Sequence, residues 1–97
     1  MTQLRFRPEV AADVREAYQW YDERSGTAAT GYLDQLEALF ERIRANPVQF
    51  PVVYREIRRA LARRYPYAVY FVLDSDAAVV LGVLHQAVHP RAWQDRE

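Results

Sequence analysis

The sequence contains neither cysteine nor lysine, and it has only three glycines. The lack of cysteine excludes a disulfide framework, a thiol nucleophile and a thiolate metal site. All thirteen basic residues are arginine, which stays charged and binds anions without shuttling protons, so a mechanism that needs a lysine acid or base is excluded too. There is no glycine-rich phosphate loop, and the two histidines lie outside any helical HExxH pattern. We therefore expect no cofactor and no metal.

Long hydrophobic runs are also missing. No apolar stretch approaches the ~20 residues of a membrane-spanning helix, and the N-terminal segment MTQLRFRPEV lacks the apolar region of a signal peptide. We therefore expect a cytoplasmic protein without membrane contact. A chain of 97 residues with 51% hydrophobic residues is enough for one core, so residues 1–97 are predicted to form a single domain.

The charge of the chain is balanced overall but uneven locally. Thirteen basic and thirteen acidic residues give no general attraction to nucleic acid. Residues 55–64, however, contain five arginines and a single acid, Glu56. This basic cluster directly precedes the most strand-like segment of the chain. It predicts a surface that contacts an anionic target or partner, or alternatively a solvated edge whose charge prevents aggregation.

The first half of the chain predicts a strand and two helices. Residues 3–6 alternate polar and apolar side chains, as a strand does. Apolar residues then recur at helical spacing over 8–24 and again over 27–45. Gly26 is interpreted as the terminator of the first helix, and Ser25 or Thr27 as the cap of the second. The short break between the helices indicates an antiparallel hairpin.

The second half predicts a sheet. Residues 47–54 contain two prolines and are interpreted as an irregular connector. Residues 57–64 are predicted as a strand, although their arginine, alanine and leucine content favours a helix. Residues 65–73 and 78–85 are apolar on both faces, as in central strands. The predicted fold is α+β: an N-terminal strand, a helical hairpin on one face of a small sheet, and a three-stranded antiparallel meander.

The opposite face of that sheet has no second layer of elements in the sequence to cover it. Exposed apolar faces of this kind mark interaction sites. We therefore expect a regular protein partner on this face. Two other arrangements also account for the pattern: homodimerisation, and folding of the C-terminal tail over the face, with Trp93 as the one large apolar anchor of that tail.

Several segments, taken in order, resemble the RelE/ParE superfamily of toxins from bacterial type II toxin–antitoxin modules, and lie closer to ParE. They are RPEVAADVREAYQWYDER, YLDQLEALFERIRANPVQFP, RRALARRYPYAVYF, VLH and PRAW. The resemblance covers nearly the whole chain. It implies a ParD-like antitoxin that binds the toxin through its C-terminal segment in a toxin–antitoxin hetero-oligomer. The residues expected to bind the antitoxin are Tyr65, Tyr67, Tyr70, Val72 and Trp93.

RelE-like members enter the ribosome and cut mRNA. Such a reaction needs a base for the 2′-hydroxyl, a cation for the phosphate and an acid for the leaving oxygen. If this protein cleaves RNA, the candidates are His85, Arg59, Arg64 and Tyr67. The neutral chain and the absent lysine weigh against it. So does the segment HQAVHPRAW, which has Ala87 and Val88 in the region where many relatives carry two arginines.

ParE-like members poison DNA gyrase through a binding surface, without chemistry of their own. A neutral protein with one basic patch suits that role, and we favour it over the ribosome as target. The residues expected to contact the target are Arg58, Arg59, Arg63, Arg64, His89 and Arg91. A third hypothesis is that the protein is an inactive relative that binds its partner or co-represses an operon. The two missing arginines would explain the loss of activity. His85 is also interpreted as a structural histidine at the end of a strand.

Overall fold

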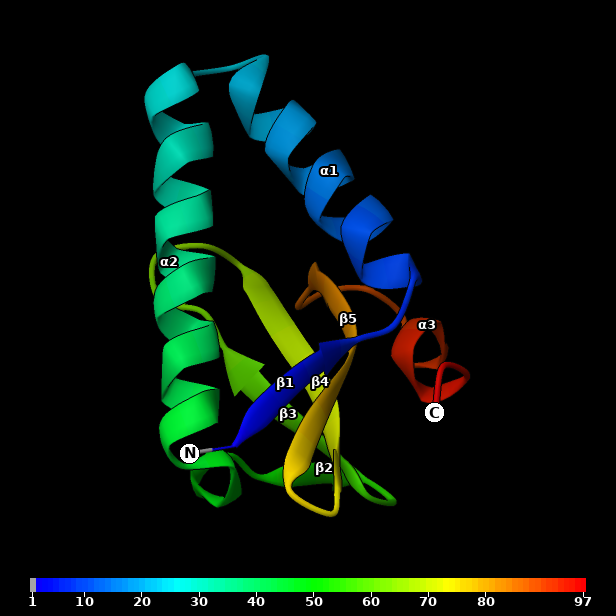
Figure 1. The fold of residues 1–97 in the computed structure, drawn as a ribbon. Coiled ribbons are helices and arrows are strands. Elements are labelled where there is room, and N and C mark those ends of the chain that lie inside the picture. Colours follow the sequence, from blue (N-terminus) through cyan, green and yellow to red (C-terminus); the bar gives the residue numbers. More distant parts are fainter. Residues whose placement is uncertain (1) are drawn as a thin grey trace.

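The computed structural model describes residues 2–97 and shows a five-stranded sheet covered by a helical hairpin (Figure 1). The sheet order is β1-β5-β4-β3-β2, with β1 parallel to β5 and all other neighbours antiparallel. The elements are β1 (Gln3–Phe6), α1 (Glu9–Asp22), α2 (Gly26–Ala45), a 3₁₀ turn η1 (Pro47–Gln49), β2 (Val52–Tyr54), β3 (Ile57–Leu61), β4 (Tyr67–Asp74), β5 (Ala77–His85) and α3 (Arg91–Gln94). The predicted α+β fold is confirmed.

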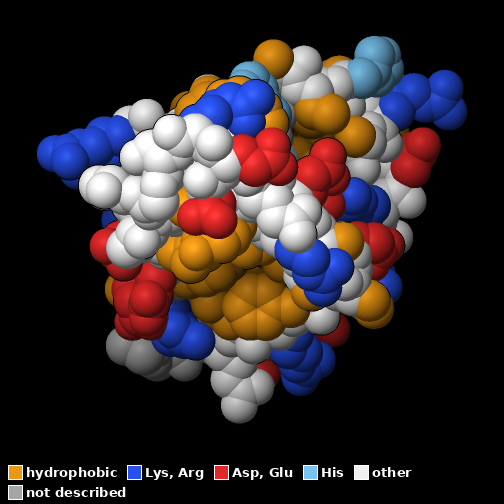
Figure 2. All heavy atoms as spheres, turned by 90° about the horizontal axis from the view of Figure 1, so that it is seen from above, with side chains coloured by type: hydrophobic (Ala, Val, Ile, Leu, Met, Phe, Trp, Pro, Cys, Tyr) orange, Lys and Arg blue, Asp and Glu red, His pale blue; other side chains and the backbone are white. Residues whose placement is uncertain are grey.

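Local sequence explains the hairpin. Ser25 caps α2, since its side chain accepts a hydrogen bond from the Ala28 N–H at 3.3 Å. Gly26 is the first residue of α2 and not the terminator of α1, which corrects the prediction. The helices meet at this connection and separate towards the sheet (Figure 1). Viewed from the connection, the molecule shows a hollow lined by hydrophobic side chains with charged side chains around it (Figure 2).

The segment predicted as an irregular connector contains a strand. Residues 52–54 pair with β3 across a two-residue turn, in which Arg55 takes a left-handed conformation with φ of 50°. Valine and tyrosine favour extended structure, and this preference outweighs the prolines at 47 and 51. The strand predicted for 57–64 is confirmed in type but ends at Leu61. Arg63 and Arg64 therefore lie in the loop before β4 and not on a strand.

The main core lies between the hairpin and the sheet. Alternation along β4 sends one set of side chains towards the helices: Tyr67, Val69, Phe71 and Leu73. From the hairpin, the core receives a row of buried residues at helical spacing: Val10, Ala17, Tyr32, Leu36, Leu39 and Ile43. Burying apolar surface at about 25 cal/mol per Å² makes this layer the main source of stability.

The far face of the sheet is covered by the C-terminal tail. Trp93 stacks on Tyr70, with ring centroids 4.5 Å apart and an angle of 11° between the planes. Tyr70 is only 1% exposed and Trp93 5%. The expectation that this face lacks a covering layer is therefore wrong, and the alternative in which the tail folds over it is what the structure shows. The physical reason is that one tryptophan is large enough to seal the small apolar centre of this face.

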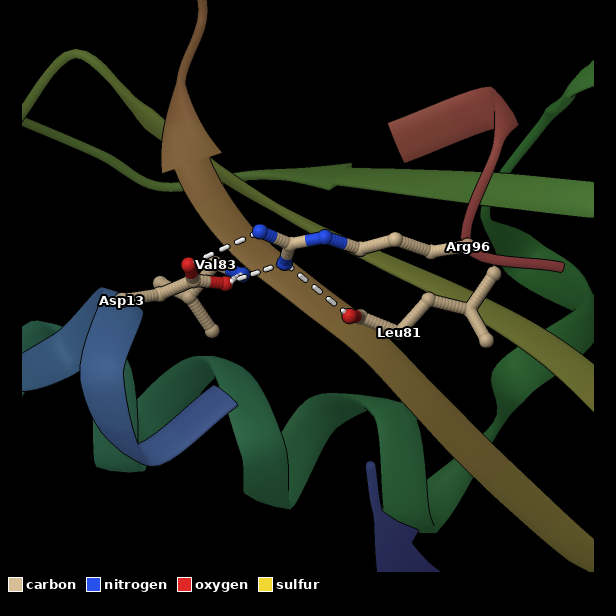
Figure 3. A network of polar contacts seen from close by, with 4 residues as sticks. All are labelled: Asp13, Leu81, Val83 and Arg96. Atoms are coloured by element: carbon tan, nitrogen blue, oxygen red, sulfur yellow. Dashed lines mark hydrogen bonds and ion pairs between the residues drawn. The ribbon is translucent and has the colours of Figure 1, made fainter. Parts of the chain in front are cut away.

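The tail is fastened to α1 by an ion pair (Figure 3). The two guanidinium nitrogens Nη1 and Nη2 of Arg96 lie 2.6 and 3.1 Å from the two carboxylate oxygens of Asp13. Asp13 also accepts the Val83 N–H at 3.0 Å, and Arg96 donates to the Leu81 carbonyl at 3.2 Å. Because β1 pairs with β5 only as far as Val80, these two side chains satisfy the β5 backbone beyond the end of β1.

Candidate functional site

His85 and Tyr67 lie together in a cleft of about 410 Å³ between α1 and the ends of β4 and β5. Their ring centroids are 5.4 Å apart. The other lining side chains include Trp20, which is 50% exposed, and two acids, Glu16 and Asp13. No arginine among residues 2–97 lines this cleft. Two arginines contact its lining residues: Arg96 is paired with Asp13, and the guanidinium of Arg24 lies 3.7 Å from the centre of the Trp20 ring. The cleft is therefore aromatic and acidic.

The surroundings of His85 and Tyr67 do not favour either side chain as a general base. His85 Nδ1 accepts the Ala87 N–H at 3.0 Å, which leaves the ring proton of the neutral imidazole on Nε2. Burial raises the pKa of Tyr67 above its ordinary value of 10.0, and the nearby Glu16 carboxylate raises it further. The phenol of Tyr67 therefore stays protonated at neutral pH.

The arginines predicted to clamp phosphate lie elsewhere. Arg58 and Arg59 are neighbours on β3, so their side chains point to opposite faces of the sheet. Arg58 donates to the Phe50 carbonyl at 2.7 Å and holds the segment before β2 in place. Arg59 pairs in register with Tyr70 on the far face. Burial raises the pKa of Tyr70, and the hydrogen bond and charge of Arg59 partly offset this rise. Neither residue lines the cleft that contains His85.

Arg63 and Arg64 lie exposed in the loop between β3 and β4, next to α2. They border a second cleft, of about 330 Å³, together with Arg42. His89 and Arg91 are exposed on the C-terminal tail, where Arg91 lies 3.9 Å from Asp95. The six arginine and histidine side chains predicted as target contacts are thus spread over both faces of β3, the loop before β4 and the C-terminal tail, and do not form one site.

An apolar groove of about 830 Å³, which was not predicted from the sequence, lies between α1, α2 and β1. It opens as the hydrophobic hollow in Figure 2. Its walls include Phe6, which is 49% exposed, and Leu33. Phe6 meets the ring of Phe40 edge to face at 5.3 Å. Both acidic and basic side chains lie on the rim, namely Arg7, Glu37, Glu41 and Arg44. A signal for the groove was present in the sequence, because Leu33 falls outside the apolar stripe that packs on the core.

Among residues 2–97, no group of three histidine, aspartate or glutamate side chains is placed to hold a metal ion. No helix in the same part of the chain is both long and apolar enough to cross a membrane.

Comparison with known proteins assigns the family. The model of the ParE toxin of the type II toxin–antitoxin system parDE matches residues 4–90. The chain belongs to the ParE toxin family. No curated relative matches it. A solved structure of the chromosomal ParDE toxin–antitoxin system from P. aeruginosa contains a similar chain, with 18% identity and a TM-score of 0.77 over 88% of this chain and 96% of that one. This similarity shows that the fold is shared.

The residues predicted to bind the antitoxin of this ParE-family protein do not share one surface. Tyr65 and Tyr67 face the helices, and the Tyr65 hydroxyl donates to the Ala28 carbonyl at 3.0 Å. Gly31 makes this possible, because a Cβ there would overlap the Tyr65 hydroxyl. Tyr70, Val72 and Trp93 lie on the far face, where Tyr70 and Trp93 bury one another. Of the five, Tyr67 alone borders one of the two larger surface hollows.

Proposed function

We propose that this ParE-family protein is a toxin that acts by binding DNA gyrase and that a ParD-like antitoxin neutralises it. The supporting observation is the chemistry of the His85 cleft. Cleavage of RNA requires cations where negative charge develops on the phosphate. Here the cleft is lined by Glu16 and Asp13 and by no arginine among residues 2–97. Of the two arginines that contact its lining, Arg96 is paired with Asp13 and Arg24 is stacked on Trp20. A phosphate would be repelled, so action through a binding surface is favoured over mRNA cleavage.

We propose the apolar groove, not the far face of the sheet, as the antitoxin site. An amphipathic segment that places apolar side chains against Phe6 and Leu33 would remove two large exposed hydrophobic side chains from water. The mixed charges on the rim would then pair with charges of both signs on the antitoxin. The groove is open in the structure, whereas the far face is already sealed by Trp93.

The target surface is proposed to include Arg63 and Arg64, which are exposed and free of ion pairs with residues 2–97. Arg58 is less suited because its guanidinium already binds the Phe50 carbonyl. His89 and Arg91 form a second exposed basic spot on the tail.

Pulse labelling after induced expression without antitoxin tests the target. DNA and protein synthesis are followed separately for the natural chain and for a Tyr67→Phe/His85→Ala variant. We expect DNA synthesis to fall first in both cases, and purified protein to inhibit supercoiling by gyrase. If protein synthesis falls first and the double variant is harmless, the protein is an RNA-cleaving toxin. If growth is unaffected while antitoxin binding persists, it is an inactive partner-binding relative.

A Leu33→Glu variant tests the groove. A charge in the middle of the apolar wall should abolish neutralisation by the cognate antitoxin while growth arrest persists. Ala12→Glu is the matched control, since Ala12 is exposed on α1 and does not line the groove. Equal neutralisation of both variants would place the antitoxin on another surface.

A further inference from the structure

A second cleft lies on the opposite flank of α2 from the apolar groove. Its lining residues come from α2 and from the loop between β3 and β4: Gln35, Ala38, Leu39, Arg42, Ala62, Arg63 and Arg64. Three guanidinium-bearing side chains thus border one cleft of about 330 Å³, and its lining contains no acid. Arg42 was not among the candidates from sequence, because it lies in α2 and is brought to the loop only by the fold.

The positive charge of this basic cleft has no counterpart in the described part of the chain. The ion pairs within residues 2–97 join Arg44 to Glu41, Arg91 to Asp95 and Arg96 to Asp13, and none involves the three arginines of the cleft. Like charges placed together repel, and an anion bound between them would relieve this repulsion. Arg42 is half-buried with its guanidinium 5.3 Å from the centre of the Phe50 ring, which restricts its orientation.

Arg64 adds a second indication. Its φ of 70° is left-handed, a conformation that residues other than glycine and asparagine adopt rarely. Residues held in such sparsely populated backbone conformations cluster at ligand-binding and active sites. Here the strained residue is one of the three that border the basic cleft.

The two flanks of α2 differ in charge. The flank towards the groove carries Glu37 and Glu41, whereas the flank towards the basic cleft carries Arg42. The basic cleft also offers little for a protein side chain to anchor in, because Leu39 is buried and its other apolar residues are alanines. Protein interfaces depend on large buried anchors. The geometry suits phosphate groups better than a peptide.

We propose that this basic cleft binds backbone phosphate of nucleic acid, with Arg42, Arg63 and Arg64 as ligands and the Gln35 amide as a further donor. Arginine forks match phosphate oxygens in geometry as well as in charge. The inference rests on the proposed function for its biological setting, in which the phosphates belong to the DNA that gyrase holds. Because the chain carries no net charge, binding should be local and sensitive to salt.

The test is fluorescence anisotropy of the full chain with a labelled 20-base-pair DNA duplex between 50 and 200 mM salt. Three phosphate contacts predict a slope of log K against log salt of about −2.7, from about −0.9 per contact. The Arg42→Gln/Arg63→Gln/Arg64→Gln variant should lose at least tenfold in affinity, with a slope near zero. A variant limited to Arg63→Gln/Arg64→Gln avoids any effect on the packing of Arg42 and should lose about two thirds of the slope.

The matched control is Arg5→Gln/Arg15→Gln/Arg55→Gln, which removes the same charge from exposed positions outside the cleft. Equal losses in control and cleft variants would mean general charge attraction and would overturn the proposal. So would absence of binding at 50 mM salt, or binding of a polyglutamate peptide in preference to the duplex. Failure here is distinguishable from failure of the proposed function, because gyrase inhibition is measured by a supercoiling assay in which this duplex takes no part.

Discussion

Arg96 and Asp13 lie 83 positions apart and form a bidentate ion pair that fastens the C-terminal tail to α1. The pair is largely sheltered, with the Asp13 side chain 9% exposed and that of Arg96 20% exposed. The hydrogen bond to Asp13 raises the pKa of Arg96, so the guanidinium stays charged throughout the accessible pH range. Residues 91–97 lie beyond the part of the chain that the ParE family model matches. The ion pair holds the tail in place beside the stacking of Trp93 on Tyr70.

Removing either partner should destabilise the protein. Arg96→Ala leaves a sheltered carboxylate unpaired, and we expect a loss of about 2–3 kcal/mol, somewhat below the range for fully buried pairs. Asp13→Asn should cost less than Asp13→Ala, because the amide oxygen can still accept the Val83 N–H. Urea denaturation of the single and double variants gives the coupling energy. Strictly additive losses would show that the ion pair contributes nothing.

Gly82 should matter because the Arg96–Asp13 ion pair passes over it. A Cβ at this position would lie 2.6 Å from Arg96 Nη1 and 3.3 Å from Asp13 Oδ2. Gly82→Ala should therefore displace the guanidinium and cost about as much as Arg96→Ala, ~2 kcal/mol. In the Arg96→Ala background the same substitution should cost less, because the closest contact is gone and only the 3.3 Å contact with Asp13 Oδ2 remains tight. A full additional loss in that background would mean that Gly82 is needed for a different reason.

The helical hairpin and its core were predictable because they depend on local spacing. Tyr32, Leu36, Leu39 and Ile43 recur at the helical period, and all four are buried. The strand over 67–73 was likewise predictable, and its side chains alternate between the two cores as a strand requires. In both cases a short stretch of sequence contains the whole pattern, so no knowledge of distant contacts is needed.

The cover on the far face was not predictable in the same way. The apolar pattern of β4 and β5 indicates that this face is covered. A protein partner, a second copy of the chain and the C-terminal tail would account for that pattern equally well. The choice depends on the contacts of Trp93 with Tyr70 and of Arg96 with Asp13, which join distant segments. The place of Arg42 in the basic cleft was not predictable for the same reason, because only the packed fold brings α2 beside the loop that carries Arg63.

Trp93 should be the most important residue of the tail. Trp93→Ala removes the ring that covers Tyr70, and loss of a buried tryptophan costs about 3–5 kcal/mol. Trp93→Phe keeps part of the stacking and should cost less. Chemical denaturation measures both losses, and the Trp93→Ala variant should also lose the blue-shifted component of tryptophan fluorescence, since Trp20 is half exposed. A loss below about 1 kcal/mol would be close to the effect of an ordinary surface substitution. It would mean that the tail contributes little to stability.

Tyr32→Phe should stabilise the protein. The Tyr32 hydroxyl is buried and has no hydrogen-bond partner among residues 2–97, and such a group costs about 1–3 kcal/mol of desolvation. The phenylalanine ring keeps the stacking on Tyr21 at 5.5 Å. Tyr65→Phe is the control: it removes a hydroxyl that does have a partner, the Ala28 carbonyl, and should destabilise by about 1 kcal/mol. The same sign of change in both variants would contradict the assignment.

Alkaline pH should lower the stability of the folded protein. Burial raises the folded-state pKa of Tyr21, Tyr32, Tyr67 and Tyr70 above the ordinary value of 10.0. A raised pKa means that the folded chain keeps phenol protons that the unfolded chain releases near pH 10, so their contribution is complete below pH 10 and decreases as the pH rises further. Urea denaturation at pH 8, 9, 10 and 11, together with tyrosinate absorbance, tests this. Tyr32→Phe should reduce the loss. If all seven tyrosines titrate together near pH 10 without loss of stability, the four rings are more accessible to solvent than the structure indicates.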